Sequence, residues 1–300
     1  MKMRIGLLCV LTLLAAACSN EPTTPEPVAA PPAAPAAAPT TPAPAETPPA
    51  PVASTPPPSP PLPVREVSEA ELQPLRDAVA RDLDDVRAQR DLARLLWEGG
   101  QYDLALNHFE RAVQIDPNHP GSLRDLGRAY QLLGRPADAE GAFRRMATIP
   151  AAYHMALHEL GKLALSQGDL QTATRYFMLS VEAKPDYTGS LYSLGVAYEQ
   201  AGRFREAYET YARVLQLEPP EGSNEALDYV DALYRMGKLD LKMGAVERAV
   251  EILTEVVAAY PTHPEAHYEF GRALQSLGRQ EEAEREFALH QQLLDANTTP

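Results

Sequence analysis

The sequence predicts an all-α protein whose folded part is an α-solenoid of about six helical hairpins. A small residue recurs at intervals of 34, 34, 34, 42 and 34 residues, at Ala93, Gly127, Gly161, Gly195, Gly237 and Gly271. A second column of glycines follows in step, at Gly100, Gly134, Gly168, Gly202, Gly244 and Gly278. Apolar residues recur at helical spacing on both sides of each glycine, so each unit is expected to form two short helices joined by a turn. A hairpin of this size cannot bury its own apolar face and therefore stacks on neighbours like itself.

Residues 1–17 have the composition of an export signal. Lys2 and Arg4 carry positive charge, an apolar run follows, and three alanines precede Cys18. The run is too short to span a membrane. The order LAAAC resembles a bacterial lipobox, which implies cleavage before Cys18 and acylation of that residue, for example with palmitate. Ser19 in place of aspartate implies the periplasmic face of the outer membrane rather than the inner one. The alternative is an ordinary signal peptide with an incidental cysteine.

Residues 18–64 are expected to form a disordered tether that starts at the lipidated Cys18. This stretch is rich in proline and alanine, and 18 of the 29 prolines lie before residue 65. Such a composition buries little apolar surface. In polyproline form the tether reaches at most ~140 Å. It is interpreted as a spacer between membrane and domain, with a proline-rich ligand for another protein as the alternative.

The remaining 236 residues carry 25 basic and 38 acidic side chains, a net charge of about −13. This balance argues against non-specific binding of nucleic acid or of an anionic membrane by the domain as a whole. Both cysteines lie before residue 19, so the folded part has no disulfide framework.

A capping helix is expected within residues 65–85. Ser68 and Glu71 form a capping-box pattern. Leu75 and Ala78 stand where the second helix of a hairpin would carry its aromatic residue and a later alanine. The segment therefore resembles an orphan second helix that covers the first end of the array, as solenoids require.

The hairpin units cover residues 86–297. They are 86–119, 120–153, 154–187, 188–221, 230–263 and 264–297, with an insertion at 222–229. An alanine and then a large apolar residue recur in each second helix, the latter at Phe109, Phe143, Phe177, Tyr211, Leu253 and Phe287. Prolines end five of the units. These columns and the period of 34 resemble the tetratricopeptide repeat. The resemblance implies a right-handed solenoid that binds ligands along the inward side of the first helices.

The 42-residue interval marks a departure from this regularity. Ser223 or Asn224 can cap a helix, so the first helix of the fifth unit is expected to begin about two turns early. Asp240 occupies the place of Tyr130 and Tyr198, which predicts less regular packing there. We expect a change of curvature at this point, and therefore a hinge between the first four units and the last two.

No phosphate loop, nucleophile elbow or cysteine pair is present. His154 and His158, and again His263 and His267, have a spacing that can bind zinc, but neither pair has the order that also places a general base. The prediction is a protein without enzymatic activity, cofactor or metal.

The candidate binding groove consists of the fifth and ninth residues of each unit, because these point inward in the related family. They are Arg90, Arg94, Arg124, Arg128, His158, Lys162, Tyr192, Val196, Tyr234, Lys238, Tyr268 and Arg272. None is acidic, although acids outnumber bases in this region. The set predicts a groove for an extended acidic segment of a partner protein. The alternative is that these residues pair with nearby acids such as Asp91, Asp125, Glu159 and Glu269.

Together these features predict a membrane-anchored periplasmic scaffold that binds an unidentified protein, does not bind nucleic acid, and helps to assemble an envelope complex. The layout resembles the outer-membrane lipoproteins that assist secretin assembly for type IV pili (pilotin-like repeat lipoproteins), although the long tether departs from it. Two alternatives are a binder of an anionic envelope polymer and an adaptor that regulates cell-wall hydrolases.

Overall fold

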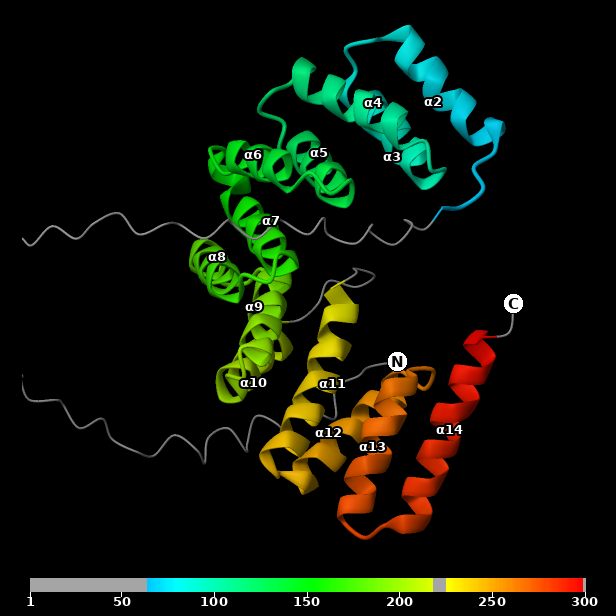
Figure 1. Cartoon of the computed structure of the whole chain (residues 1–300), viewed down its shortest axis with the longest axis vertical. Helices are drawn as coiled ribbons and strands as arrows, with labels where there is room; N and C mark the ends of the chain where they lie inside the picture. The colour runs from blue at the N-terminus through cyan, green and yellow to red at the C-terminus, as the bar shows by residue number, and fades with distance from the viewer. Residues whose placement is uncertain (1–63, 218–224, 299–300) are drawn as a thin grey trace, which may run out of the picture. The chain divides into compact units, whose positions relative to one another are not determined.

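The structure is a computed structural model that describes residues 64–217 and 225–298 (Figure 1). All of these belong to one compact unit of the chain, Ser59–Pro300. The predicted signal, Cys18, almost all of the tether and residues 222–224 of the insertion lie outside the described residues. In the described part the regular structure is helical throughout, so the prediction of an all-α solenoid is confirmed.

Twelve of the α-helices form six consecutive hairpins (Figure 1). The first helices of the six hairpins are α3 (Val86–Glu98), α5 (Pro120–Leu132), α7 (Tyr153–Ser166), α9 (Thr188–Gln200), α11 (Glu225–Met243) and α13 (Pro264–Ser276). The second helices are α4 (Tyr102–Ile115), α6 (Pro136–Met146), α8 (Leu170–Ala183), α10 (Phe204–Gln216), α12 (Val246–Ala259) and α14 (Gln280–Thr298). Helix α2 (Glu69–Arg81) precedes the array, and a short 3-10 helix, Pro150–Ala152, leads into α7.

Each hairpin closes on the glycine that the sequence marks as its turn. All six of these glycines have φ between 70° and 78°, a left-handed conformation that only glycine adopts without strain. The residue after the glycine donates its backbone N–H to a carbonyl five residues earlier, as Arg135 does to Tyr130 at 2.8 Å and Arg203 to Tyr198 at 2.9 Å. This bond satisfies a carbonyl that the helix end would otherwise leave unpaired.

The two helices of a hairpin approach closely where the small residue of the first meets the aromatic ring of the second. A Cβ atom added to Gly161 would lie 2.5 Å from Cε1 of Phe177, and Gly127 stands in the same relation to Phe143. Phe143 also packs with Leu160 and Leu163 of the next unit. The ring therefore fills the space above its own glycine and the junction to the following hairpin at once.

Helix α2 covers the first end of the array. It packs on α3, and its Leu72 and Val79 are buried in the same core as Leu92 and Leu96. The Glu71 carboxylate accepts hydrogen bonds from the backbone N–H and the hydroxyl of Ser68 at 2.9 and 2.8 Å. These bonds and the neighbouring Arg65 lower the pKa of Glu71 to about 2.

Helix α11 starts at Glu225, five residues before the regular start of its unit. It packs on both α9 and α10, so the fourth and fifth units are in direct contact. The predicted early start is confirmed, although it amounts to five residues rather than two full turns. The change of curvature stays a prediction.

Asp240 replaces a repeated tyrosine–arginine stack. In the second unit Arg135 lies 4.4 Å over the ring of Tyr130, and in the fourth unit Arg203 lies 4.4 Å over Tyr198. Asp240 occupies the same position in the fifth unit but is fully buried at 0% exposure. An aspartate at a site shaped for a tyrosine ring needs a charged partner to be tolerated there.

That partner is Arg248 of α12. Its guanidinium donates to Asp240 Oδ1, while Asp240 Oδ2 is buried without a hydrogen-bond partner in the described residues. Tyr208 of α10 is the other titratable group beside this carboxylate, and Arg248 lies 5.4 Å over its ring. Burial raises the pKa of Asp240 to about 6, despite the opposing effect of Arg248.

Asp240 is expected to make the stability of the protein fall as pH rises through about 6. The folded state binds the Asp240 proton more tightly than the unfolded chain, whose carboxyl has a pKa of 3.8. The favourable contribution is present in full below the unfolded pKa and is lost above the folded one, and it amounts to between about 1 and 3 kcal/mol. Asp240→Asn removes the titration, so in urea unfolding the stability of the variant relative to the wild type should increase between about pH 4.5 and 7.5. A difference that is constant over this range would contradict the assignment.

Among the residues that the structure describes, no helix combines the length and the apolar character needed to cross a lipid bilayer.

Candidate protein-binding face

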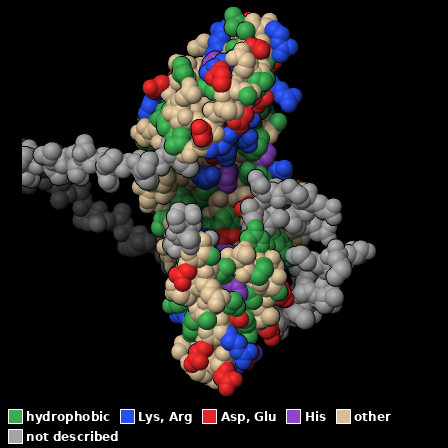
Figure 2. Space-filling view, turned by 90° about the vertical axis from the view of Figure 1, so that its right-hand side faces the viewer, with side chains coloured by type: hydrophobic (Ala, Val, Ile, Leu, Met, Phe, Trp, Pro, Cys, Tyr) green, Lys and Arg blue, Asp and Glu red, His purple; other side chains and the backbone are tan. Residues whose placement is uncertain are grey.

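The candidate groove residues lie on the first helix of each hairpin. The fifth and ninth residues of a unit are four apart, so they share one face of their helix. Helices α5 and α7 lie to the right of α6 and α8 in Figure 1, and Figure 2 views the molecule from that side. Lys and Arg side chains gather across the middle of the face shown.

Most arginines of this face are held by carboxylates. Arg90 donates to Asp125 of the next unit from Nε and Nη2, at 2.9 and 2.8 Å, and the pair is almost buried. Arg94 reaches the same carboxylate oxygen at 2.8 Å. Arg128 bonds in the same way to the buried Glu159, one further unit along.

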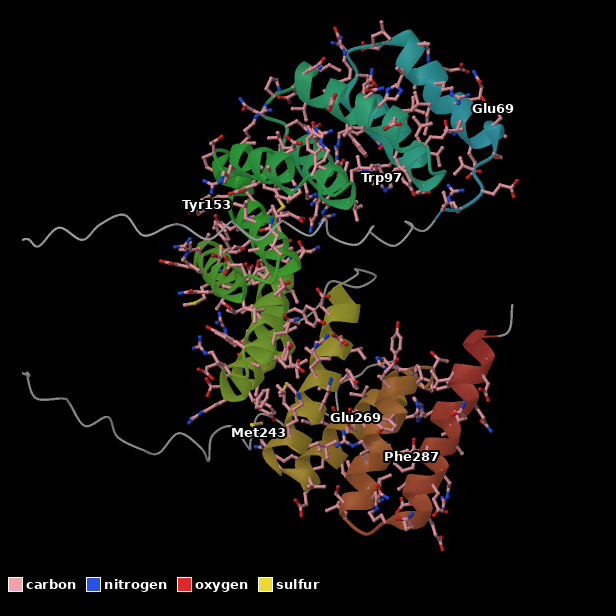
Figure 3. All side chains as sticks on the ribbon, in the orientation of Figure 1. Glu69, Trp97, Tyr153, Met243, Glu269 and Phe287 are labelled. Atoms are coloured by element: carbon pink, nitrogen blue, oxygen red, sulfur yellow. The ribbon has the colours of Figure 1, made fainter. Side chains whose placement is uncertain are left out.

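In the last unit an arginine pairs with an acid of its own helix. Arg272 donates to Glu269 at 2.8 Å within α13 (Figure 3). Four of the five candidate arginines thus follow the alternative that the sequence leaves open, in which they pair with neighbouring acids. The bridges of Arg90, Arg94 and Arg128 fix one hairpin on the next, whereas that of Arg272 lies within one helix.

Three cations of the face have no carboxylate partner in the described part of the chain. They are Arg124, Lys162 and Lys238. An acid at the sixth position of a unit binds the arginines of the preceding unit, but the fourth unit has Ser193 there, so Lys162 lacks a counterpart. For Lys238 the equivalent acid is Glu269, whose carboxylate is bound by Arg272.

Arg124 and Glu159 lie where the second unit meets the third, and each has one buried polar atom without a hydrogen-bond partner in the described residues. Arg124 is the equivalent of Arg90, and Glu159 is the equivalent of Asp125. The two atoms are Arg124 Nε and Glu159 Oε2. Each such group costs about 1 to 3 kcal/mol when it stays unpaired. The junction of the second and third units therefore retains unused hydrogen-bonding capacity.

His158 is not part of the exposed face, contrary to the sequence prediction. It is 7% exposed, lies between the rings of Phe177 and Tyr187, and has its Nδ1 3.2 Å from the Ser190 hydroxyl. Burial lowers its pKa to about 4. His158 is therefore a neutral packing residue near neutral pH.

The three candidate tyrosines differ in how much of the ring is exposed to solvent. Tyr268 is exposed and packs against Phe287 and His290. Tyr234 is half-buried with its ring 5.0 Å from that of His263. Tyr192 is also half-buried, and its hydroxyl donates to Asp231 of α11. Only Tyr268 offers a largely open ring for stacking.

Tyr192 belongs to a polar cluster that joins the fourth and fifth units. Arg235 of α11 donates to Asp231 at 2.8 Å, to the Tyr192 hydroxyl at 3.0 Å and to Glu199 of α9 at 3.0 Å. The Tyr211 hydroxyl donates to the same Glu199 oxygen at 3.3 Å. Arg235 stands at the sixth position of its unit, where the first three units and the last carry acids, so the charge pattern is inverted at this junction.

The two histidine pairs do not assemble a metal site in the described residues. His267 has Nδ1 2.6 Å from Glu286 and Nε2 3.0 Å from the Pro261 carbonyl. His263 accepts the backbone N–H of Ala266 and thus caps α13. No group of three potential ligands comes together in this part of the chain.

The sequence offers the arginine–carboxylate pairs between neighbouring hairpins only as an alternative, although a signal for them is present in it. The paired residues are 31 or 35 positions apart. These separations are three residues less and one residue more than the repeat length of 34. Counting residues that point inward from a single helix cannot show this, because the partner lies on the neighbouring hairpin.

Four family models described as tetratricopeptide repeat match the chain, at residues 84–149, 156–187, 190–225 and 240–292. The chain belongs to the tetratricopeptide repeat family. The repeats expected from the sequence are thereby confirmed.

Curated relatives share this repeat region at low identity. The chain is 27% identical over 192 residues to the BBSome complex member BBS4 homolog of Drosophila melanogaster, covering 60% of this chain and 38% of the relative. It is 19% identical over 189 residues to Anaphase-promoting complex subunit 3 of Schizosaccharomyces pombe, covering 63% and 27%. The chain thus spans less than half the length of these relatives.

Solved structures show the same tetratricopeptide fold. PilW, described as a widely conserved type IV pilus biogenesis factor, matches with a TM-score of 0.54 and 19% identity, over 68% of this chain and 91% of PilW. The Cut9-Hcn1 structure matches with a TM-score of 0.57 and 14% identity, over 75% and 43%. At these identities the likeness concerns the fold alone.

Proposed function

We propose that this tetratricopeptide repeat protein is a non-catalytic, lipid-anchored scaffold at the periplasmic face of the outer membrane. Its first-helix face holds an extended acidic segment of a partner protein, and the tether raises the effective concentration of that segment at the membrane. The specific role that we propose for this scaffold is to help assemble an envelope complex of the type IV pilus or secretin kind. Its support is the shared fold of PilW together with the lipobox resemblance of LAAAC.

One observation carries the binding proposal. Arg124, Lys162 and Lys238 lack carboxylate partners within the described residues, although the chain has a net charge of −14 and most neighbouring arginines are paired. These three lie on the first helices of the second, third and fifth units, α5, α7 and α11. A segment long enough to contact all three must cross several hairpins, which favours an extended ligand with separated carboxylates.

Reversing these three charges is expected to abolish capture of the partner. In Arg124→Glu/Lys162→Glu/Lys238→Glu, the acidic segment meets carboxylates where the wild type offers cations, and like charges repel. Crosslinking in producing cells, affinity purification and mass spectrometry measure capture. Far-UV circular dichroism should stay helical, because none of the three makes an ion pair in the described structure.

The matched control changes three exposed arginines by the same total charge. Arg87, Arg205 and Arg285 all lie on the array, and their side chains are 90%, 82% and 71% exposed in their surface ion pairs. Their replacement by glutamate should leave capture unchanged. Equal loss of capture in both triple variants would show that net charge acts rather than the proposed face.

The lipid anchor has its own test. Cys18→Ser removes the sulfur that the lipobox resemblance assigns to acylation, and without acyl chains the remaining polypeptide has no firm membrane attachment. The wild type should incorporate labelled palmitate and sediment with membranes, whereas the variant should incorporate none and appear in the soluble periplasmic fraction. Membrane sedimentation of an unlabelled Cys18→Ser protein would contradict the anchor.

A second class of ligand fits the same cations. An anionic envelope polymer would bind through charge alone, so its affinity would fall steeply with salt and depend little on ligand shape. An acidic protein segment should keep part of its affinity at high salt through shape and aromatic contacts.

The other alternative is an adaptor that regulates cell-wall hydrolases. Such an adaptor would co-purify with a hydrolase rather than with a secretin.

A further inference from the structure

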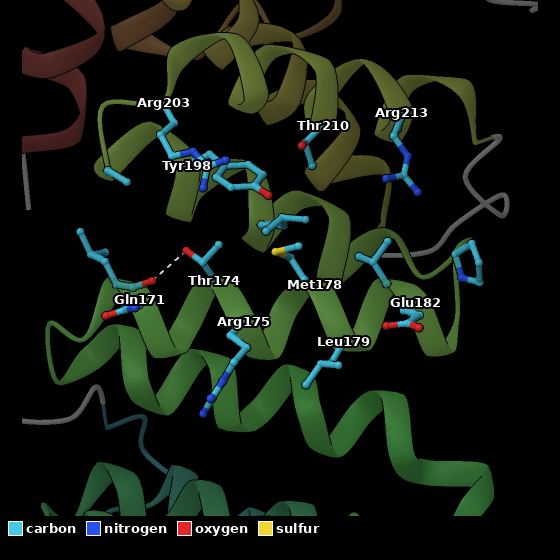
Figure 4. A pocket seen from close by; sticks show the side chains of 15 residues that line it. Gln171, Thr174, Arg175, Met178, Leu179, Glu182, Tyr198, Arg203, Thr210 and Arg213 are labelled. Carbon is cyan, nitrogen blue, oxygen red and sulfur yellow. Dashed lines mark hydrogen bonds between the residues drawn. The ribbon is translucent and has the colours of Figure 1, made fainter. Parts of the chain in front are cut away.

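A groove of about 1010 Å³ lies between α8 and α10 (Figure 4). Its floor includes Leu194 and Tyr198 of α9. Each residue turns a helix by about 100°, so Leu194 lies about 200° around α9 from Tyr192 of the candidate face. The groove is therefore separate from the site of the proposed function.

The groove is apolar where a polar surface is expected. Met178 and Leu179 of α8 line it and are 51% and 37% exposed. The equivalent residues are Glu110–Arg111 in the first unit and Arg144–Arg145 in the second. An outer helix normally carries polar residues at such positions, and adjoining exposed apolar side chains indicate an interaction surface.

The rim of the groove is basic. Arg175 on α8 and Arg213 on α10 line opposite walls, and neither makes an ion pair in the described residues. Arg203 adds a third guanidinium, which is paired with Glu206 and lies over Tyr198. Glu182 is the one acid among the lining residues. The rim thus has a surplus of positive charge in an otherwise acidic protein.

The walls also restrict the conformation of a ligand. They are helices whose backbone groups are already hydrogen-bonded, and the Thr174 hydroxyl is turned to the Leu170 carbonyl at 2.7 Å (Figure 4). An extended segment would bury backbone N–H and C=O groups against the apolar floor without partners. A helix satisfies its own backbone and can insert apolar side chains three and four residues apart.

We propose that this groove binds an amphipathic helix of a second protein, with an apolar stripe that packs on Met178 and Leu179 and with carboxylates that pair with Arg175 and Arg213. The scaffold then holds two partners at once on opposite sides of α9. This surface is independent of the cations that carry the proposed function.

A peptide selection tests the proposal on the full chain. A phage-displayed library of random peptides about 16 residues long is selected for binding to the wild type. The enriched peptides should be acidic, with apolar residues at i, i+3 or i+4, and i+7. Basic peptides, peptides without this period, or no enrichment would overturn the proposal.

Variants then locate the binding site. Met178→Glu/Leu179→Arg installs the residues of the first unit, so folding should be preserved, and peptide affinity should fall about tenfold or more. Arg175→Glu/Arg213→Glu should also weaken binding, while Leu104→Glu, an equally exposed site at 51% on α4, should not. Unchanged affinity in Met178→Glu/Leu179→Arg would refute the site.

Two other occupants give distinct results. A synthetic peptide of residues 19–63 that binds the wild type but not Met178→Glu/Leu179→Arg would assign the groove to the chain's own N-terminal segment. A wild-type dimer in sedimentation analysis that becomes monomeric in the same variant would assign it to a second copy. Either result would overturn the proposal of a partner helix.

Discussion

Replacing Arg235 with methionine is expected to lower the free energy of unfolding by about 3 to 5 kcal/mol. Arg235 is the single cation of the cluster that joins α9 to α11, and it holds both Asp231 and the almost buried Glu199. Without it the Glu199 carboxylate, which is 9% exposed, and the half-buried Asp231 carboxylate both lose their cation. Loss of one partner from a buried ion pair is costly for this reason, even where the intact pair adds little net stability.

The loss should also separate the two parts of the array, because repeat stability depends on contacts between neighbouring units. Trp97, the only tryptophan, lies in the first hairpin (Figure 3), so its fluorescence reports the N-terminal units. Circular dichroism reports all helices. In urea, the gap between the midpoints from these two probes should widen in Arg235→Met relative to the wild type.

Arg285→Met is the control, because Arg285 is exposed and only 3.9 Å from Glu281. Surface pairs of this kind contribute at most about 1 kcal/mol. Equal effects of the two substitutions, or an unchanged gap in Arg235→Met, would show that the cluster does not hold the junction together.

Phe177→Ala is expected to destabilise the protein by about 3 to 5 kcal/mol. The ring is fully buried above Gly161 and is among the largest side chains with no exposed surface. Its removal leaves a cavity between the two helices of the third unit. Because the ring packs directly on Gly161, the effect of replacing this glycine should depend on whether the ring is present.

Gly161→Ala should cost about 1 to 3 kcal/mol in the wild type, because its Cβ would collide with a ring that cannot move. In the Phe177→Ala background the same change should stabilise, since the collision is gone and alanine favours a helix over glycine. Gly141→Ala is the control, because nothing lies within 4 Å of an added Cβ in α6. Additive effects of Gly161→Ala and Phe177→Ala in urea unfolding would contradict this contact.

The hairpins could be predicted from sequence because their signals are local. The six turn glycines, the apolar period and the early start of α11 each depend on a few neighbouring residues. The pairing of Gly161 with Phe177 follows from the same repeat. Such features need no knowledge of how one hairpin is placed on the next.

The binding face could be predicted only in part, because its chemistry depends on contacts between hairpins. The sequence identifies Arg90, Arg94 and Arg128 as inward-pointing, but it offers their pairing with nearby acids only as an alternative to a free basic groove. It also makes His158 a candidate, although the rings of Phe177 and Tyr187 bury it. The groove beside Met178 was not predicted, since it arises from the spacing of two helices that are not consecutive in sequence.

Of the cations that the sequence places in a continuous basic groove, the structure therefore leaves three without a carboxylate partner among the described residues. The paired arginines hold the units together and tolerate little change, whereas Arg124, Lys162 and Lys238 remain available to a ligand. A partner segment that binds here competes with few internal ion pairs.

Site-specific photo-crosslinking in producing cells can show whether a partner protein binds over Arg124, Lys162 and Lys238. A photoreactive amino acid is placed at Lys162 on the candidate face and, separately, at the exposed Arg205 on α10. We expect one discrete crosslinked protein at position 162, which is lost when Arg124→Glu and Lys238→Glu are added. No such product is expected at position 205. The same product at both positions, or one at position 162 that survives the two charge reversals, would contradict binding at this face.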